Sequence, residues 1–311
     1  MDTPSETIVT DPDPYVIYRP AALLAPVVFS SPHSGRYYPE EFVAVSRLDR
    51  AKLKSSEDSY VDELYGAVPG LGGVLIAAQY ARAYCDPNRE PYELDPNMFS
   101  GALPPQANTR SPRVAAGLGT LPKTVGGGAE IYRGKLPVSE IERRLARSYR
   151  PYHEALRALV DEARRRFGWS LLIDCHSMPP MLPLPLGASG VSGSGGAWAE
   201  REDWRSDQLP NVILGDCHGG TCTGVITQVV EDKFRSLGYH VQRNSPYAGG
   251  FTTRHWGHPQ TGSQALQIEI SRALYMDADG KEKGPGFAKM QADLEEVAAA
   301  IIRLAQQGYC P

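Results

Sequence analysis

The 311-residue chain lacks most features that would place it in a specialised class of protein. No hydrophobic run approaches the roughly 18 apolar residues of a membrane-spanning helix, so we expect no membrane partner. The net charge of −4 is not the positive excess typical of nucleic-acid-binding proteins. The five cysteines include no CxxC pair, and the N-terminus has neither the basic start nor the apolar core of an export signal. These absences predict a cytoplasmic protein with reduced thiols.

Several common catalytic motifs are incomplete as well. His153 and Glu154 begin an HExxH metalloprotease motif, but position 157 holds Arg where the second His is required. Segment 132–135 resembles the end of a phosphate-binding loop, but that loop needs Gly at position 129, which is Ala, and Ser or Thr at 136, which is Leu. Segment 179–209 contains no GxSxG elbow. The sequence therefore supports neither an HExxH peptidase, nor a P-loop site, nor a serine hydrolase.

What the chain does contain is a series of short apolar runs that end in polar side chains. Residues 27–30 predict a buried strand that leads into His33, and residues 171–177 predict another that ends in Asp174 and His176. In open α/β sheets, ligands bind beyond the carboxyl ends of the strands, so both histidines are candidates for a site. Each could instead be an ordinary hydrogen-bonded core residue.

Acidic residues stand at two further places. A helix start at 55–56 would place Glu57 and Asp58 in the first turn, where they either only stabilise the helix dipole or ligate a metal beside a strand end. Residues 265–270 alternate like a strand and carry Glu269 among apolar neighbours. A buried acid costs free energy unless it is paired or used, so Glu269 is a candidate for catalysis.

Arginines provide candidate anion-binding groups. A strand predicted at 73–78 leads to Arg89, which could hold a substrate carboxylate in a bidentate grip or pair with Asp86 to hold its own loop. The Gly-rich segment 247–257 carries a second candidate, Arg254. The sequence alone leaves the choice between binding and structural roles open.

The order of the predicted elements indicates the fold class. Helical periodicity covers 139–167, with an interruption at Pro151, and further helices are predicted at 223–236 and 287–307. Strands and helices alternate along the chain. This order predicts a three-layer α/β/α fold with a mainly parallel or mixed sheet.

No linker or internal repeat divides the chain, so we expect a single domain over residues 1–311. Segment 100–137 shows no hydrophobic periodicity and is predicted to be a long loop that is either functional or disordered. Residues 1–14 are predicted to be flexible, and the Pro-, Gly- and Ser-rich residues 179–209 are predicted to form a flap-like insertion over the site.

Six polar segments follow one another in a recognisable order. They are SPHSG (31–35), EDSYVDELY (57–65), DPNR (86–89), DCHS (174–177), GGFTTRH (249–255) and QIEI (267–270) with Tyr275 and Met276. Together they resemble the N-formylglutamate amidohydrolase family, from about residue 27 to residue 277. The resemblance implies a zinc hydrolase of the phosphorylase/hydrolase-like fold, related in layout to zinc carboxypeptidases. It also implies release of formate from N-formyl-L-glutamate late in histidine degradation.

The resemblance also assigns roles to individual residues. It implies that one zinc ion, or another divalent metal, is held by His33, Asp58 and His176, with Glu57 as the rival of Asp58. Two imidazoles and a carboxylate leave a position open for water on tetrahedral zinc. It implies Glu269 as the general base, with the remaining catalytic candidates Arg254 and His255 and the substrate-binding candidates Asn88, Arg89 and Arg133.

The expected partner is a small anionic N-acyl amino acid. Two alternatives stay open from the sequence. The protein could be a related metal-dependent N-acyl amino acid hydrolase, peptidase or amidase. It could also be a non-catalytic protein that binds an acidic ligand through its arginines.

Overall fold

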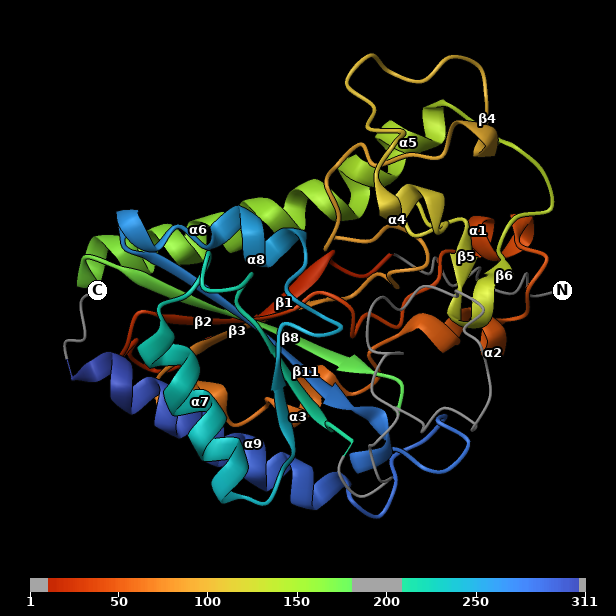
Figure 1. Ribbon diagram of the computed structural model, residues 1–311. Helices are drawn as coiled ribbons and strands as arrows, with labels where there is room; N and C mark the ends of the chain where they lie inside the picture. Colours follow the sequence, from red (N-terminus) through yellow and green to blue (C-terminus); the bar gives the residue numbers. More distant parts are fainter. Residues whose placement is uncertain (1–10, 181–208, 308–311) are drawn as a thin grey trace, which may run out of the picture.

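The computed structural model describes residues 11–180 and 209–307, and its centre is a seven-stranded sheet (Figure 1). The strand order is β1-β3-β2-β8-β11-β9-β10. The strands are β1 (Tyr15–Tyr18), β2 (Val27–Ser31), β3 (Val74–Ala78), β8 (Ser170–Met178), β9 (Val212–Gly215), β10 (Val241–Arg243) and β11 (Ser263–Ser271). Neighbours run parallel, except that β1 is antiparallel to β3 and β9 is antiparallel to β11. The prediction of an α/β fold with a mixed sheet is confirmed.

Helices cover both faces of this sheet, because successive side chains of a strand point to opposite sides. The helices are α1 (Glu40–Val45), α2 (Arg50–Leu53), α3 (Val61–Leu64), α4 (Pro112–Ala115), α5 (Ser139–Arg144), α6 (Arg150–Phe167), α7 (Gly224–Ser236), α8 (Phe251–Trp256) and α9 (Phe287–Gln306). Val28 and Leu172 pack against α6 on one face, whereas Phe29 and Ile173 join a cluster with α3, α7 and α9 on the other. Figure 1 shows α6 and α8 on one side of the sheet and α7 and α9 on the other. None of the helices described is long and apolar enough to cross a membrane.

The sheet face under α6 changes from apolar to polar toward the ends of the strands. On β8 the side chains that share this face run from Leu172 through Asp174 to His176. On β11 they run from Ala265 to Glu269, and the parallel register places Glu269 opposite His176. The strand pattern therefore gathers polar side chains at one edge of the sheet.

The predicted helix 139–167 is present but divided. It consists of α5, a π-helical turn at Leu145–Tyr149, and α6, which has Pro151 in its first turn. Proline has no N–H to donate and fits the first turn of a helix, so the predicted interruption at Pro151 is confirmed in this form.

A second hydrophobic cluster lies beside the carboxyl ends of the strands (Figure 1). It includes segment 100–137, which was predicted to be a long loop but forms α4 and short strands: β4 (Phe99–Ser100), β5 (Thr124–Val125), β6 (Ala129–Glu130) and β7 (Leu136–Pro137). At its centre the buried Arg144 donates to the Tyr84 carbonyl (3.0 Å) and to the Tyr132 hydroxyl (2.8 Å). These contacts are too distant along the chain to produce a periodic pattern.

Segment 55–65 differs from its prediction. Residues Lys54–Ser56 form a 3₁₀ turn and α3 begins only at Val61, so Glu57 and Asp58 do not lie in a first helical turn. The prediction was wrong because the backbone here bonds to another segment, with the Asp58 N–H donating to the His33 carbonyl at 3.0 Å. The Gly-rich segment 247–257 contains a short helix, α8.

The predicted flap at 179–209 and most of the predicted flexible segment 1–14 lie outside the described residues. In the described part of the N-terminal segment, Asp11 accepts hydrogen bonds from the Tyr37 hydroxyl and from Arg147. These contacts attach the start of the described chain to the second hydrophobic cluster.

Candidate active site

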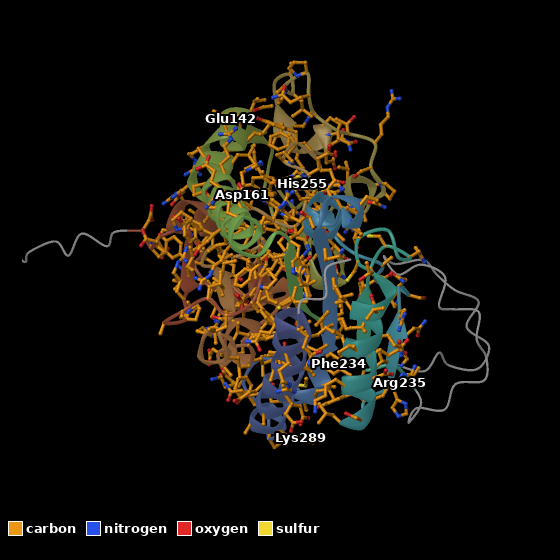
Figure 2. The ribbon with its side chains drawn as sticks, turned by 90° about the vertical axis from the view of Figure 1, so that its left-hand side faces the viewer. Glu142, Asp161, Phe234, Arg235, His255 and Lys289 are labelled. Atoms are coloured by element: carbon orange, nitrogen blue, oxygen red, sulfur yellow. The ribbon has the colours of Figure 1, made fainter. Side chains whose placement is uncertain are left out.

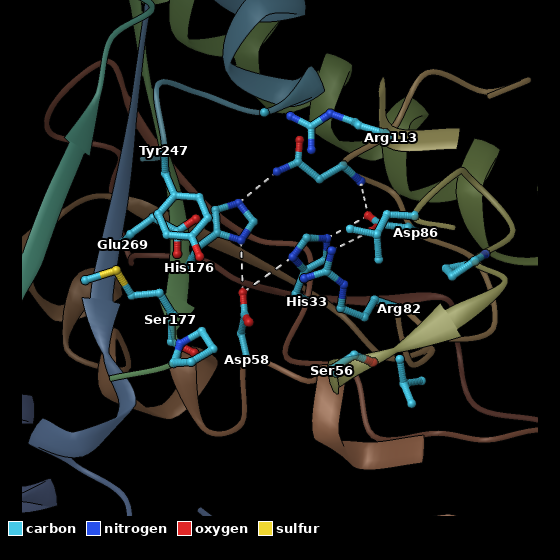
Figure 3. A pocket seen from close by; sticks show the side chains of 18 of the residues that line it. His33, Ser56, Asp58, Arg82, Asp86, Arg113, His176, Ser177, Tyr247 and Glu269 are labelled. Carbon is cyan, nitrogen blue, oxygen red and sulfur yellow. Dashed lines mark hydrogen bonds and ion pairs between the residues drawn. The ribbon is translucent and has the colours of Figure 1, made fainter. Parts of the chain in front are cut away.

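Three side chains from separate segments converge at the carboxyl ends of the central strands (Figure 3). They are His33 just after β2, Asp58 before α3 and His176 on β8, and we call them the triad. One nitrogen or oxygen atom from each lies within 4.8 Å of the others, and the two imidazole centroids are 4.7 Å apart. All three residues are buried. The structure thus brings together the three residues that the sequence proposed as metal ligands.

The orientation of the triad suits a cation. Asp58 Oδ2 is 3.4 Å from His33 Nδ1 and 3.0 Å from His176 Nδ1. The opposite ring nitrogens are engaged elsewhere, because His33 Nε2 donates to Asp86 Oδ1 (2.6 Å) and His176 Nε2 lies 3.0 Å from Asp174 Oδ1. With hydrogen on Nε2 of His33, its Nδ1 lone pair points toward the Asp58 carboxylate, an arrangement that repels unless a cation lies between. His176 Nε2 lies 2.9 Å from Asn88 Nδ2, which can only donate, so without a metal His176 carries hydrogen on Nδ1 and donates it to Asp58 Oδ2.

A metal ion would fit these donors. Within the described residues, His33 Nδ1 is buried and has no hydrogen-bond partner. Two imidazole nitrogens and a carboxylate oxygen are a common donor set for zinc with an open coordination position. The Asp86 carboxylate, which accepts from His33 Nε2, is the kind of outer partner that fixes the tautomer of a metal-binding histidine, and Asp174 Oδ1 lies 3.0 Å from His176 Nε2.

The electrostatics of the triad favour an anionic Asp58. Burial acts to raise the pKa of Asp58, but the close approach of His176 and His33 holds that pKa well below its usual range. Burial lowers the pKa of His33, which favours the neutral imidazole with a free lone pair. Burial opposes the charged form of His176 too, yet Asp174 and Asp58 raise its pKa well above the usual value.

Glu57 points away from the triad. Its carboxylate accepts hydrogen bonds from the Tyr38 hydroxyl (2.5 Å) and the Ser59 hydroxyl (3.2 Å). Asp58 is held from the other side, because Arg272 Nη2 donates to its Oδ1 at 3.0 Å. This leaves Asp58 Oδ2 facing the histidines, so the geometry favours Asp58 over Glu57 as the carboxylate ligand.

Glu269 faces the same space from the neighbouring strand β11 (Figure 3). It is 8% exposed, and Gln267 Nε2 donates to its Oε1 at 3.1 Å. Burial raises the pKa of Glu269 to about 7. A carboxyl group with such a pKa can both accept and return a proton near neutral pH.

The triad and Glu269 lie at one side of a cleft of about 470 Å³. Its opposite side is formed largely by residues 113–128, which we call the outer wall, and by the loop 246–250. Four arginines line the cleft: Arg82, Arg89, Arg113 and Arg272. The cleft therefore combines a potential metal site with an excess of cationic side chains.

Asn88 and Arg89, predicted to bind substrate, line this cleft but are engaged within the protein. Asn88 Oδ1 accepts the Thr252 N–H (2.8 Å), and its Nδ2 donates to Asp174 Oδ2 (3.2 Å). Arg89 Nε donates to the Leu118 carbonyl at 2.7 Å. Their predicted substrate contacts stay predictions.

Arg133, Arg254 and His255 are not brought to the triad. All three are exposed, and none of them lines the cleft. Arg254 donates to the Gly249 carbonyl, and the His255 ring stacks on Phe251 on α8 (Figure 2). Their predicted catalytic and binding roles also stay predictions.

Sequence reasoning did not assign a role to several residues of the site. Asp86 and Asp174 stood in segments singled out for their position after strands, and that position was the available signal. Arg82, Arg272 and Tyr247 had no such signal. Arg113 lies in a segment without periodicity, so nothing in the sequence connected it to the histidines.

Known proteins resemble this chain over most of its length. The family model for N-formylglutamate amidohydrolase matches residues 25–276. An N-formylglutamate deformylase of Pseudomonas putida is 27% identical over 81% of this chain and 82% of its own length. One from Pseudomonas aeruginosa is 29% identical over 89% of this chain and 90% of its own length.

A solved structure shows the same similarity in three dimensions. The crystal structure of N-formylglutamate amidohydrolase from Ralstonia eutropha JMP134 has 34% sequence identity and a TM-score of 0.82, and the match covers 95% of this chain and 99% of that one. The region that the family model matches contains the whole triad and Glu269. The chain therefore belongs to the N-formylglutamate amidohydrolase family.

Proposed function

We propose that this protein hydrolyses the formyl amide of N-formyl-L-glutamate to formate and L-glutamate. The observation that carries the proposal is the buried triad, which lies beside Glu269 at one side of a cleft rich in arginine. The names of the Pseudomonas relatives and of the Ralstonia structure support the choice of substrate.

We further propose zinc as the cofactor. His33 Nδ1, Asp58 Oδ2 and His176 Nδ1 would hold the ion, because these atoms converge and His33 Nδ1 is buried without a partner among the described residues. Bound zinc would supply Lewis acidity, which polarises a carbonyl and lowers the pKa of water. Asp86, Asp174 and Arg272 would keep the three ligands in position.

Glu269 is the proposed general base. Its Oε atoms would take a proton from the attacking water and later deliver that proton to the leaving amine nitrogen of glutamate. A pKa of about 7 is suited to both transfers, because the group gains and loses a proton with little free-energy difference near neutral pH. Gln267, which donates to Oε1, would orient the carboxylate.

The cationic side chains would stabilise negative charge in the cleft. Arg82 pairs with Asp86 behind His33, and its charge acts on both His33 and Glu269. That position suits stabilisation of the oxygen of the formyl group as it becomes negative. Asn88 and Arg89 border the same space, whereas Arg133, Arg254 and His255 have no contact with the triad.

Family resemblance is our basis for placing the reaction in histidine degradation and for a relation to the zinc carboxypeptidases. The cysteine pattern is our basis for placing the protein in the cytoplasm. The shared chemistry would be a metal-assisted attack of water on an amide carbonyl.

The direct test is formate release from N-formyl-L-glutamate by the purified protein, with the zinc content of the same sample measured by mass spectrometry. We expect about one zinc per chain, loss of activity on removal of the metal with a chelator, and recovery when zinc is returned. A parallel panel of N-acetyl amino acids tests the alternative acyl group. Hydrolysis of the N-acetyl compounds without release of formate would refute the proposed substrate.

A further inference from the structure

One arginine of the cleft makes no hydrogen bond or ion pair through its side chain with the described residues. Arg113 lines the cleft from the outer wall, and its guanidinium has no hydrogen-bond or ion-pair partner among the described residues. Figure 3 shows its side chain on the far side of the two imidazole rings from Asp58. Arg113 is therefore a cation that faces the cleft and whose donors have no partner within residues 11–180 and 209–307.

The other three arginines of the cleft are held by the protein. Arg82 pairs with Asp86 at 2.7 Å, and Arg272 pairs with Asp58 at 3.0 Å. Arg89 donates to two backbone carbonyls, those of Asn88 and Leu118, at 2.7 Å each. Because each of these three already has a partner in the protein, they act first on the architecture of the site, whereas Arg113, which has none among the described residues, is available to a ligand.

The backbone that carries Arg113 is well fixed. Ser111 caps α4, its Oγ accepting the Val114 N–H at 3.1 Å. The Arg113 carbonyl accepts the Leu118 N–H at 2.8 Å, and the Val114 side chain is buried in the outer wall. The position is therefore set by the fold, and a bound anion would order only the side chain.

The surroundings of Arg113 favour an anion. Burial and the nearby Arg254 both lower the pKa of Arg113, because they disfavour its charge. A carboxylate beside the guanidinium would remove that disadvantage and could accept two parallel hydrogen bonds. The neighbouring Ala116, Leu118 and Pro122 also line the cleft and offer apolar surface to methylene groups.

The place of Arg113 indicates which carboxylate it would bind. Arg82 pairs with Asp86, which in turn accepts from His33, whereas Arg113 has no such link to the triad and lies on the far side of the two imidazole rings from Asp58 (Figure 3). With the formyl amide at the triad, the α-carboxylate stays close to the reacting nitrogen and the side-chain carboxylate extends farther away. The more distant cation thus matches the side chain of the substrate.

We propose that Arg113 binds the side-chain carboxylate of the substrate and so makes the enzyme selective for acidic N-formyl amino acids. The inference rests on the proposed function, since it assumes that the formyl amide lies at the triad. It assigns Arg113 to substrate binding and gives it no part in the bond-breaking step.

The test compares N-formyl-L-glutamate with N-formyl-L-glutamine, which has nearly the same shape but no side-chain charge. For Arg113→Gln we expect kcat/KM on the glutamate substrate to fall about ten- to a hundredfold, mostly through KM, because a hydrogen-bonded ion pair is lost. On the glutamine substrate we expect a change of less than about twofold. Arg113→Lys keeps the positive charge but cannot donate two parallel hydrogen bonds. Its kcat/KM on the glutamate substrate should lie between those of the wild type and Arg113→Gln.

Arg110→Gln is the matched control, because Arg110 is exposed on the same segment and does not line the cleft. It should leave both substrates unchanged. Equal losses on both substrates for Arg113→Gln, or no loss on the glutamate substrate, would overturn the proposal. A third substrate, N-formyl-L-glutamic acid α-amide, lacks the charge of the α-carboxylate. If Arg113→Gln lowered kcat/KM on the other two substrates but not on this α-amide, Arg113 would bind the α-carboxylate and the proposal would fall. Circular dichroism and zinc content confirm that each variant is folded and loaded, and Arg113→Lys serves if the Gln variant does not fold.

Calorimetric binding of glutarate, a dicarboxylate without a formyl amide, separates this inference from the proposed function. We expect glutarate to bind the wild-type protein and to bind Arg113→Gln at least about tenfold more weakly. If the protein releases no formate but binds glutarate through Arg113, the proposed function fails and the assignment of Arg113 stands. If formate is released and glutarate binding does not depend on Arg113, the assignment fails and the function stands.

Discussion

The two sides of the cleft are built in different ways. On the side of the triad, each reactive group is held by at least one further side chain: His33 by Asp86, His176 by Asn88, and Glu269 by Gln267. On the outer wall, short elements fix the backbone but Arg113 has no described partner. Side chains that must act at fixed distances are thus held by additional contacts, whereas the side chain that faces the variable part of a substrate has no such contact among the described residues.

The difference has an energetic side. Around the triad, buried charges are compensated by neighbours of opposite charge. Removal of one partner would therefore leave the other charge buried and unpaired. In the outer wall the charge of Arg113 is disfavoured until a ligand arrives. Substitutions on the two sides should therefore differ in kind, with effects on chemistry and metal affinity on one side and on selectivity on the other.

The largest effect is expected for Glu269→Gln. This change keeps the shape of the side chain and removes the proton acceptor, so kcat should fall by about 10² to 10⁴. Formate release by enzyme of matched zinc content is the measurement. Glu295→Gln on α9, an exposed position outside the cleft, is the control. An unchanged kcat for Glu269→Gln would remove Glu269 from the mechanism.

The same substitution should stabilise the metal-free protein at high pH. Burial raises the Glu269 pKa to about 7, so the folded state binds more protons than the unfolded state between about pH 4 and pH 7. The stability of the wild-type protein therefore falls as pH rises through this range. Glu269→Gln avoids the penalty and should increase the free energy of unfolding by about 3 kcal/mol at pH 8.

Urea unfolding of both metal-free proteins at pH 8 and pH 5 measures this difference. The gain from Glu269→Gln should shrink toward the lower pH, where the wild-type carboxyl group is already protonated in the folded state. A gain that is independent of pH would show that Glu269 does not carry the buried charge assigned to it.

A smaller effect is expected for substitution of the two carboxylates that lie behind the histidine ligands. Asp86→Asn and Asp174→Asn remove the carboxylates that hold the outer nitrogens of His33 and His176. Zinc affinity should weaken about 10- to 100-fold in each, measured by competition with a chromogenic chelator. Asp279→Asn, an exposed change outside the cleft, should leave the affinity unchanged. Wild-type affinity in both site variants would argue against zinc coordination through Nδ1.

The elements of the triad side could be predicted in large part from the sequence, because apolar runs such as 171–173 are local signals of buried strands. His33 and His176 could be selected for the same reason, since each follows or ends such a run. The carboxylate ligand was harder to place. Glu57 and Asp58 are adjacent, and only contacts with segments far apart along the chain decide which one turns toward the histidines.

The outer wall could not be predicted in the same way. Segment 100–137 is organised by contacts far apart along the chain, such as those of Arg144 with Tyr84 and Tyr132. Such contacts leave no periodicity, so the segment was interpreted as a loop and Arg113 was not singled out. Register is a further limit, because the pairing of Glu269 with His176 depends on how β8 and β11 align.

The smallest effects are expected for the exposed residues of α8 that family resemblance marks as functional. Arg254→Gln and His255→Gln should each change kcat/KM by less than about twofold, because neither side chain lines the cleft and surface changes are usually near neutral. The measurement is the kcat/KM of each α8 variant and of Arg113→Gln on N-formyl-L-glutamate in the same assay. Losses as large as those of Arg113→Gln would mean that α8 moves toward the cleft when substrate binds. The outer wall would then share substrate recognition with α8, and the contrast between the fixed and the free side of the site would need to include that helix.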